Sequence, residues 1–408
     1  MGRVRGAALL LVAGLAPVLG ACRARAEAVQ GESQLRTLVR QMIPSVERAA
    51  GMKFKTPPVV ERRTRAQVRD YVIHKLDEDL PPAELAGVQA AYRLFGLLPD
   101  SLDLRATMVD LLTEQVAGYY DPDSNALYVA ADVDSPLVRT TVSHELVHAL
   151  QDQYMNLDSV MQQRRQNDRR SAAQAILEGQ ATLGQILVLM PEQSGIPLPS
   201  FWETRKVFRA QMASMKEFAH APLWLRESVI FPYLAGADFV RWYDTRHPGH
   251  QPFGAAMPLS TEQILHPDRY AAGDAPVDLA FAPAAGRTVR YEDDLGEFET
   301  RLLFEQLLGD TAEAQAPALA SGWGGDRYQV ITTGGGEALV WYSVWDDAAA
   351  RDRFVAGLRR AWRPRPGRSS RVEPLLVACH PGARLVDAPA GWSGWTAVPL
   401  VNLRAKGE

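Results

Sequence analysis

The stretch Thr141-Val-Ser-His144-Glu145-Leu-Val-His148-Ala-Leu150 carries two histidines four positions apart, with a glutamate directly after the first. The run predicts a helix, and residues four apart on a helix share one face, so both imidazoles can approach one metal ion. Zn²⁺ accepts imidazole nitrogen as a ligand, and the Glu145 carboxylate can then reach a water molecule held by the ion. The pattern therefore indicates a zinc-dependent hydrolase, provided that a third ligand exists. The alternative is a chance match on a structural helix.

The composition is that of an ordinary globular protein, with 408 residues of which 47% are hydrophobic and 23% charged. A net charge of −4 gives no indication of nucleic acid or of an anionic membrane surface as the main partner. The two cysteines, Cys22 and Cys379, are too few for a disulfide framework or for a zinc site built from several cysteines.

Residues 1–26 form a predicted export signal, with arginines ahead of an apolar run over residues 7–20 that is too short to span a bilayer comfortably. Ala24-Arg25-Ala26 is one candidate cleavage site. Leu19-Gly20-Ala21-Cys22 resembles the lipobox of bacterial lipoproteins, in which the cysteine is lipidated and anchors the protein. Both alternatives predict an exported protein, either secreted or held at the bacterial cell envelope.

Glu178 lies in the middle of an apolar stretch, residues 171–190, that is predicted to be a helix. A buried carboxylate without a partner is costly, so this side chain needs a cation. Because two histidines already require a third ligand, Glu178 is the candidate. A salt bridge to an arginine is the alternative.

Two other acidic residues compete for this role. Asp152 lies one turn after His148, where it is better suited to orienting a ligand than to binding the metal. Asp168 falls in the charged segment 161–170, where exposure to solvent is expected. Tyr154 occupies the position of the third histidine in the metzincin pattern, which excludes that subclass.

A hairpin is predicted over residues 118–130, where two apolar and aromatic runs flank an Asp-Pro-Asp-Ser-Asn cluster. An exposed strand edge beside the motif helix would suit pairing with an extended peptide, and a purely structural hairpin is the equal alternative. His266, at the end of a short predicted helix, and Tyr270 are candidates to donate a hydrogen bond to an oxyanion. Capping or packing is the alternative role for His266.

The last hundred residues predict a small α+β module whose role the sequence does not indicate. After an Ala, Pro and Gly-rich loop over residues 271–288, we expect a hairpin over 326–345, a helix over 346–362 and a final strand over 372–379. The predicted division is an export signal over residues 1–26, a main domain over 27–310 and the module over 311–408.

The chain resembles the zincin metallopeptidases, and in particular their glutamate-liganded branch and uncharacterised predicted metallopeptidases among bacterial lipoproteins. The resemblance rests on four stretches, which are Gly118–Pro122, Ser143–Gln153, Leu177–Thr182 and Ser260–Pro267. It implies an α+β fold in which a mixed sheet packs on the motif helix with the glutamate helix beneath. It also implies His144, His148 and Glu178 as zinc ligands and Glu145 as the general base. The 30 positions between His148 and Glu178 are more than the thermolysin pattern has, and the Asn-Glu pairing of that pattern is missing.

These observations predict a zinc metallopeptidase that cleaves a peptide or protein substrate outside the cytoplasm. The alternatives are an envelope lipoprotein that binds zinc without catalysis, and a zinc hydrolase of a non-peptide amide or ester. Neither the cleavage specificity nor the oligomeric state follows from the sequence.

Overall fold

The computed structural model describes residues 31–161, 163–193, 198–284, 286–309 and 312–404. The predicted export signal with Cys22 lies outside these residues. No helix within the described ranges combines the length and the apolar character needed to cross a membrane.

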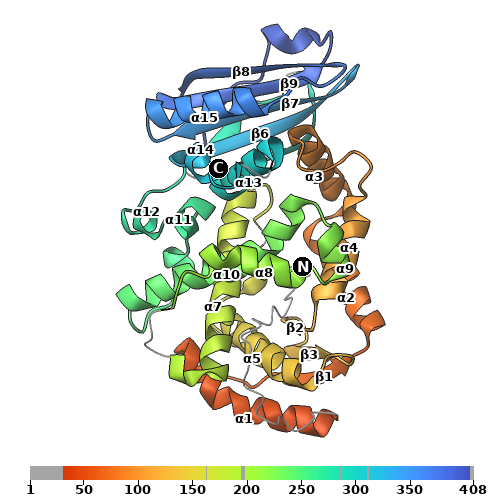
Figure 1. Cartoon of the computed structure of the whole chain (residues 1–408), viewed down its shortest axis with the longest axis vertical. Coiled ribbons are helices and arrows are strands. Elements are labelled where there is room, and N and C mark those ends of the chain that lie inside the picture. The colour runs from red at the N-terminus through yellow and green to blue at the C-terminus, as the bar shows by residue number, and fades with distance from the viewer. Residues whose placement is uncertain (1–30, 162, 194–197, 285, 310–311, 405–408) are drawn as a thin grey trace, which may run out of the picture.

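A small mixed sheet lies at one end of the molecule (Figure 1). Its central strand β3 (Ala126–Ala130) pairs in parallel with β1 (Val59–Arg63) and antiparallel with β2 (Gly118–Asp121), so the strand order is β1-β3-β2. The β2–β3 hairpin forms where the sequence predicts it. The helices α1 (Glu32–Ala50) and α5 (Ser135–Asp152) pack beside this sheet.

Helices fill the middle of the molecule, and two long ones, α7 and α10, pack against each other along it (Figure 1). The helices between the two sheets are α2 (Arg65–Asp79), α3 (Pro82–Phe95), α4 (Leu104–Gln115), α6 (Leu157–Met161), α7 (Asn167–Leu189), α8 (Arg205–Met212), α9 (Lys216–His220), α10 (Leu223–Arg246), α11 (Thr261–Leu265), α12 (Pro267–Ala271) and α13 (Gly296–Leu308). The motif helix α5 packs on α7, as the resemblance implies.

A five-stranded antiparallel sheet lies at the opposite end, in the order β5-β6-β7-β9-β8 (Figure 1). Its strands are β5 (Thr288–Asp293), β6 (Trp323–Thr333), β7 (Gly336–Trp345), β8 (Arg368–Val377) and β9 (His380–Pro389). The helices α14 (Ala316–Ala320) and α15 (Ala348–Ala361) accompany it, and β4 (Leu279–Phe281) pairs with β10 (Val401–Leu403).

The α+β class is confirmed, and the C-terminal part is more elaborate than predicted. The expected final strand is a hairpin, because Ala378 and Cys379 adopt positive φ angles of 47° and 71° and reverse the chain from β8 into β9. The strand β5 precedes residue 311 and pairs with β6, so the sheet begins ahead of the predicted C-terminal module. The division of the chain at that residue stays a prediction.

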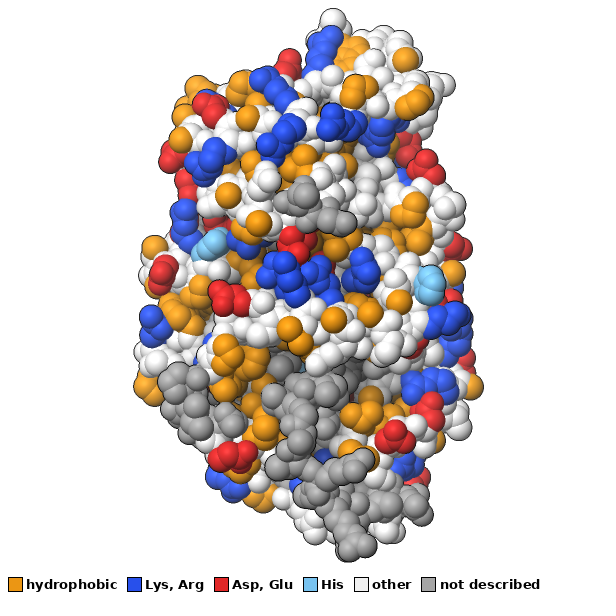
Figure 2. Space-filling view, in the orientation of Figure 1, with side chains coloured by type: hydrophobic (Ala, Val, Ile, Leu, Met, Phe, Trp, Pro, Cys, Tyr) orange, Lys and Arg blue, Asp and Glu red, His pale blue; other side chains and the backbone are white. Residues whose placement is uncertain are grey.

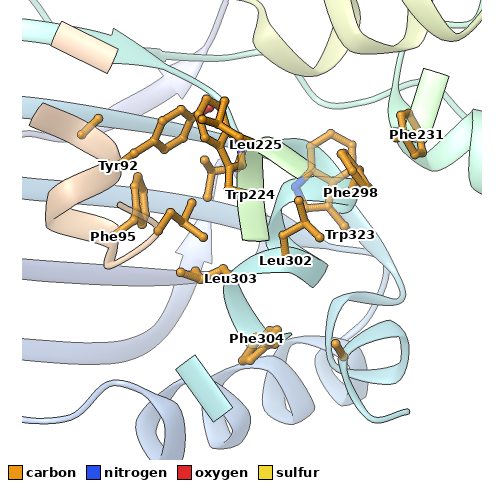
Figure 3. Packing of buried hydrophobic residues seen from close by; sticks show 14 of the residues in the cluster. Tyr92, Phe95, Trp224, Leu225, Phe231, Phe298, Leu302, Leu303, Phe304 and Trp323 are labelled. Carbon is orange, nitrogen blue, oxygen red and sulfur yellow. The ribbon is translucent and has the colours of Figure 1, made fainter. Parts of the chain in front are cut away.

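Aromatic and aliphatic side chains from α3, α10 and α13 meet the inner face of the five-stranded sheet (Figure 3). Phe95 of α3 contacts Trp341 edge to face with ring centroids 5.4 Å apart, and Phe231 of α10 stacks on Phe298 of α13 at 4.0 Å. This core joins the C-terminal sheet to the helices that lead down to the small sheet.

Basic side chains gather over the upper part of the molecule, around α15 (Figure 2). The helix α15 and the strand β8 contribute the exposed Arg353, Arg359, Arg360 and Arg371. The overall net charge of −4 therefore conceals a basic end.

The α7–α10 contact depends on two glycines. A methyl group on Gly179 of α7 would overlap the backbone of Gly236, and one on Gly236 of α10 would overlap the carbonyl of Ala175. The two backbones therefore approach more closely than any larger residue at these positions allows.

Replacement of Gly236 by alanine should destabilise the protein by about 1–3 kcal/mol, because the added methyl group forces the two helices apart. Gly334→Ala is the matched control, since a methyl group there meets no atom within 4 Å. Urea unfolding followed by circular dichroism measures both changes. Equal stability of the two variants would contradict the proposed contact.

Asp168 is buried, not exposed as predicted from its charged surroundings. Its Oδ1 accepts hydrogen bonds from the backbone N–H of Thr261, at 3.0 Å, and from the Thr261 hydroxyl. Burial raises the pKa of Asp168 to about 7, although these hydrogen bonds limit the rise. Burial also raises the pKa of Glu299 to about 7 and that of Asp294 well above its ordinary value. Asp168, in the first turn of α7, thus belongs to a group of buried acids that includes Asp294 and Glu299.

These acids should make the protein less stable as the pH rises from about 4 to about 7. In the unfolded chain they lose their protons near pH 4, whereas the folded chain retains them to about pH 7, so raising the pH through this window favours unfolding. The midpoint of urea unfolding should therefore be lower at pH 7 than at pH 5. Asp168→Asn should reduce this difference, and an unchanged difference would show that Asp168 does not titrate in this window.

Candidate metal centre

The N-terminal end of the motif helix α5 is exposed to solvent, and its remainder is enclosed by protein. Pro136 lies in its first turn, where a missing N–H costs nothing. From Thr141 to Gln151 every side chain is buried, because the helix lies between the β2–β3 hairpin and α7. Polar side chains in this segment consequently face protein and must find partners there.

Two of these buried side chains, His144 and His148, converge on a third from α7. The Nε2 atoms of His144 and His148 lie 3.2 and 3.4 Å from the same oxygen, Oε2 of Glu178 on α7. The candidate ligand atoms of all three residues lie within 4.8 Å of one another. Ligands at about 2.0 Å from a tetrahedral zinc ion are separated by about 3.3 Å, so the spacing fits such an ion.

The orientation of His148 is set by a residue three positions further along α5. Its Nδ1 lies 2.8 Å from Oε1 of Gln151, and the Gln151 amide donates to the carbonyl of Leu177 at 3.0 Å and to Oε1 of Gln180 at 2.9 Å. Since an amide oxygen only accepts, Nδ1 of His148 carries a proton, which leaves Nε2 as the nitrogen that a metal ion can bind in place of a proton. Gln151 therefore holds the histidine in the tautomer that binds metal and ties α5 to α7.

Burial and the mutual contacts of His144, His148 and Glu178 shift the pKa values of all three residues. Although burial opposes it, the two histidines, His148 foremost, hold the pKa of Glu178 at about 2. Burial lowers the pKa of His144, whereas for His148 the nearby Glu178 carboxylate outweighs burial and raises the pKa. Glu178 is therefore ionised between two imidazoles in a site closed to solvent.

Glu145 lies beside the cluster without joining it. Both of its carboxylate oxygens are buried and lack a hydrogen-bond partner among the described residues. Burial raises the pKa of Glu145 to about 8, and the Glu178 charge adds to this rise, whereas His148 and the backbone of Tyr120 oppose it. Buried polar groups without a protein partner are typical of sites that bind an ion, a water molecule or another ligand.

The residues present fit a zinc ion. Oε1 of Glu178 is, like the Glu145 oxygens, buried with no partner among the described residues. Two imidazole nitrogens and one carboxylate form a donor set typical of catalytic zinc, which leaves a fourth position for water or substrate. The identity of the metal is part of the proposal below.

The sequence did not single out Tyr233 of α10. Its ring stacks on that of His144, with centroids 5.9 Å apart and planes inclined by 27°, and it is buried. The sequence around it shows only a helix, so no local pattern distinguishes it. Gln151 had a signal, because three positions after His148 is the same helix face.

The other predicted candidates lie elsewhere. Asp152 accepts a hydrogen bond from the Tyr120 hydroxyl at 2.9 Å, so orienting His148 is the task of Gln151. His266 is part-exposed at the junction of α11 and α12, where its Nε2 lies 3.0 Å from Glu297 and 2.9 Å from Arg301. The Tyr270 hydroxyl donates to the carbonyl of Ala256. The structure brings neither His266 nor Tyr270 to the metal cluster.

Comparison with known proteins gives little further information. Residues 287–377 match the model of a domain of unknown function (DUF8575); the match includes β5 to β8 of the C-terminal sheet but neither β9 nor the metal cluster. No curated protein matches the chain. A solved structure from Chloroflexus aurantiacus, described as a "putative hydrolase with a novel fold", is 16% identical and covers 59% of this chain and 89% of its own, with a TM-score of 0.38. That degree of likeness carries no conclusion about fold or reaction.

Removal of the Glu178 carboxylate should abolish metal binding. We expect the protein, stripped with a chelator and titrated by calorimetry, to bind one equivalent of zinc, and Glu178→Ala to bind it more than about 100-fold more weakly. Gln151→Ala should lose about 10–100-fold, the usual cost of removing the partner of a ligand. Asp152→Asn, on the same helix, is the control and should bind as the unaltered protein does. Unchanged affinity in Glu178→Ala would exclude that residue as a ligand.

Proposed function

We propose that the protein is a zinc-dependent peptidase with His144, His148 and Glu178 as ligands and Glu145 as the general base. The observation that supports this most directly is the convergence of two imidazoles on one buried carboxylate with a second, unpaired carboxylate beside them. A purely structural histidine pair would leave the Glu145 carboxylate buried for no gain.

Each residue has a distinct task in this proposal. Zinc, when bound, polarises a carbonyl group and lowers the pKa of water towards about 7. Glu145 accepts a proton from the attacking water at a carboxylate oxygen and delivers it to the leaving amine, a role worth about 10²–10⁴-fold in rate.

The surroundings of the ligands favour a preorganised site. Gln151 fixes the tautomer of His148, and the Tyr233 ring restricts rotation of His144. Ligands held in place before substrate binds need no rearrangement during the reaction, and such preorganisation is a general source of catalytic rate.

Peptides are favoured over other amides by the β2–β3 hairpin beside the motif helix, since Tyr120 of β2 lies close enough to Glu145 to affect its pKa. A backbone segment next to the base is suited to align an extended substrate. Action outside the cytoplasm, with or without an anchor at Cys22, belongs to the same proposal and rests on the predicted export signal.

Glu145→Gln should bind one equivalent of zinc with nearly unchanged affinity but lose about 10²–10⁴-fold in peptide hydrolysis, because glutamine cannot accept the proton. A quenched peptide library, assayed with and without chelator, gives the rate, and calorimetry gives the zinc affinity. Zinc binding without cleavage of any peptide by the unaltered protein would favour a non-catalytic zinc lipoprotein. Cleavage confined to small esters would favour the non-peptide hydrolase.

A further inference from the structure

A cavity of about 480 Å³ lies between the metal cluster and the C-terminal sheet. Its walls are mostly apolar and come from α3, α10 and α13, including Tyr92, Trp224, Leu225, Phe231 and Phe298, five of the residues that Figure 3 labels. A space of this size, with aromatic walls, is typical of a binding site for a small ligand or for a few residues of a larger one.

The cavity adjoins the metal cluster at one end. Tyr233 lines the cavity and also stacks on the ligand His144. Gln174, another lining residue, precedes Glu178 by one turn of α7 and therefore lies on the same face of that helix. A chain held at the metal would thus continue into this cavity.

A positively charged side chain lies further along the same wall of the cavity. Arg170 lines the cavity one turn before Gln174 on α7. The hydrogen bond recorded for its side chain runs to Oδ1 of Asn167, at 3.0 Å, although a guanidinium carries five N–H donors. Despite burial, the carboxylate of Asp293 keeps the pKa of Arg170 above its ordinary value, so the group is charged.

Four acidic residues of the described chain line the cavity. Glu78 accepts a hydrogen bond from Lys75 at 3.1 Å, and the carboxylate of Asp79, like that of Asp293, lies close enough to Arg170 to raise its pKa. Asp293 accepts from the backbone N–H groups of Asn167 and Asp294 and from the Tyr291 hydroxyl. Glu299 has two donors of its own, the Tyr92 hydroxyl at 2.7 Å and the Trp224 indole at 3.0 Å. Arg170 therefore balances part of this negative charge, and the N–H donors beyond the one that binds Asn167 are what it can offer to an anionic ligand.

We propose that Arg170 binds the terminal carboxylate of a short apolar peptide, so that the enzyme removes a few residues from the C-terminus of its substrate. This inference rests on the proposed function and specifies its substrate class. A guanidinium is the side chain best matched to a carboxylate, because it donates two parallel hydrogen bonds.

The separation between Arg170 and the metal cluster limits the length of the released fragment. Arg170 precedes Glu178 by eight positions on α7, which at about 1.5 Å per residue is about 12 Å. A separation of this order along the helix axis is spanned by a few extended residues. Short C-terminal fragments are therefore the expected products.

The experiment compares a hexapeptide of Phe and Leu that has a free C-terminus with its amidated twin and with its N-acetylated twin. Amidation should lower kcat/KM of the zinc-loaded protein by about 10- to 100-fold, mainly through KM, because a charge-assisted hydrogen bond is lost. Acetylation should change little, and mass spectrometry should find short fragments released from the C-terminus. The inactive variant Glu145→Gln should show the same preference in binding. Calorimetry should give a larger dissociation constant for the amidated peptide than for the free acid.

Arg170→Gln should bind and cleave the free acid as poorly as the unaltered protein does the amide, and Arg170→Lys should restore part of the preference by retaining the charge. Arg169→Gln, one position away and exposed, is the matched control. Equal cleavage of acid and amide would overturn the role of Arg170 and leave the peptidase proposal standing, as would a loss on acetylation. If neither peptide is cleaved, the quenched peptide library decides the proposed function, and equal binding of acid and amide by Glu145→Gln excludes the carboxylate site.

Discussion

Burial of the Glu178 carboxylate in the middle of α7 is the constraint on which the rest of the site depends. A charge with no access to solvent is tolerated only where cations or hydrogen-bond donors surround it. Here the two histidines of α5 lie within 3.4 Å of it, and the Gln151 amide fastens the same pair of helices one turn away. The packing of α5 on α7 and the chemistry of the centre therefore have a single origin.

Much of this centre could be predicted because its signals are local. The spacing of His144 and His148 defines a face of one helix, and a glutamate within an apolar run stands out without any knowledge of the fold. The α+β class can likewise be predicted from local patterns, because helices and strands differ in the spacing of their apolar residues and are separated by turn residues. That Glu178 would meet these histidines across 30 positions was inferred from the cost of a buried carboxylate and from the zincin resemblance, and the structure brings the three side chains together.

The remainder depends on contacts that leave no local pattern. Asp168 has the sequence surroundings of an exposed acid, yet Thr261, 93 positions later, covers it. Tyr233 becomes part of the site only because α10 crosses α7 at one particular place. The strand β9 was missed since its turn, Ala378-Cys379, contains none of the glycine or asparagine usual at positive φ. Long-range packing, and not residue chemistry, decides each of these.

The glycine contact beside Glu178 has a consequence for the choice of metal. Gly179 follows the ligand directly, and its contact with Gly236 allows α7 neither to rotate nor to move outward without loss of packing. Backbone packing therefore holds the Glu178 carboxylate at a set distance from the two imidazoles, and any metal ion that these three residues bind must fit this spacing.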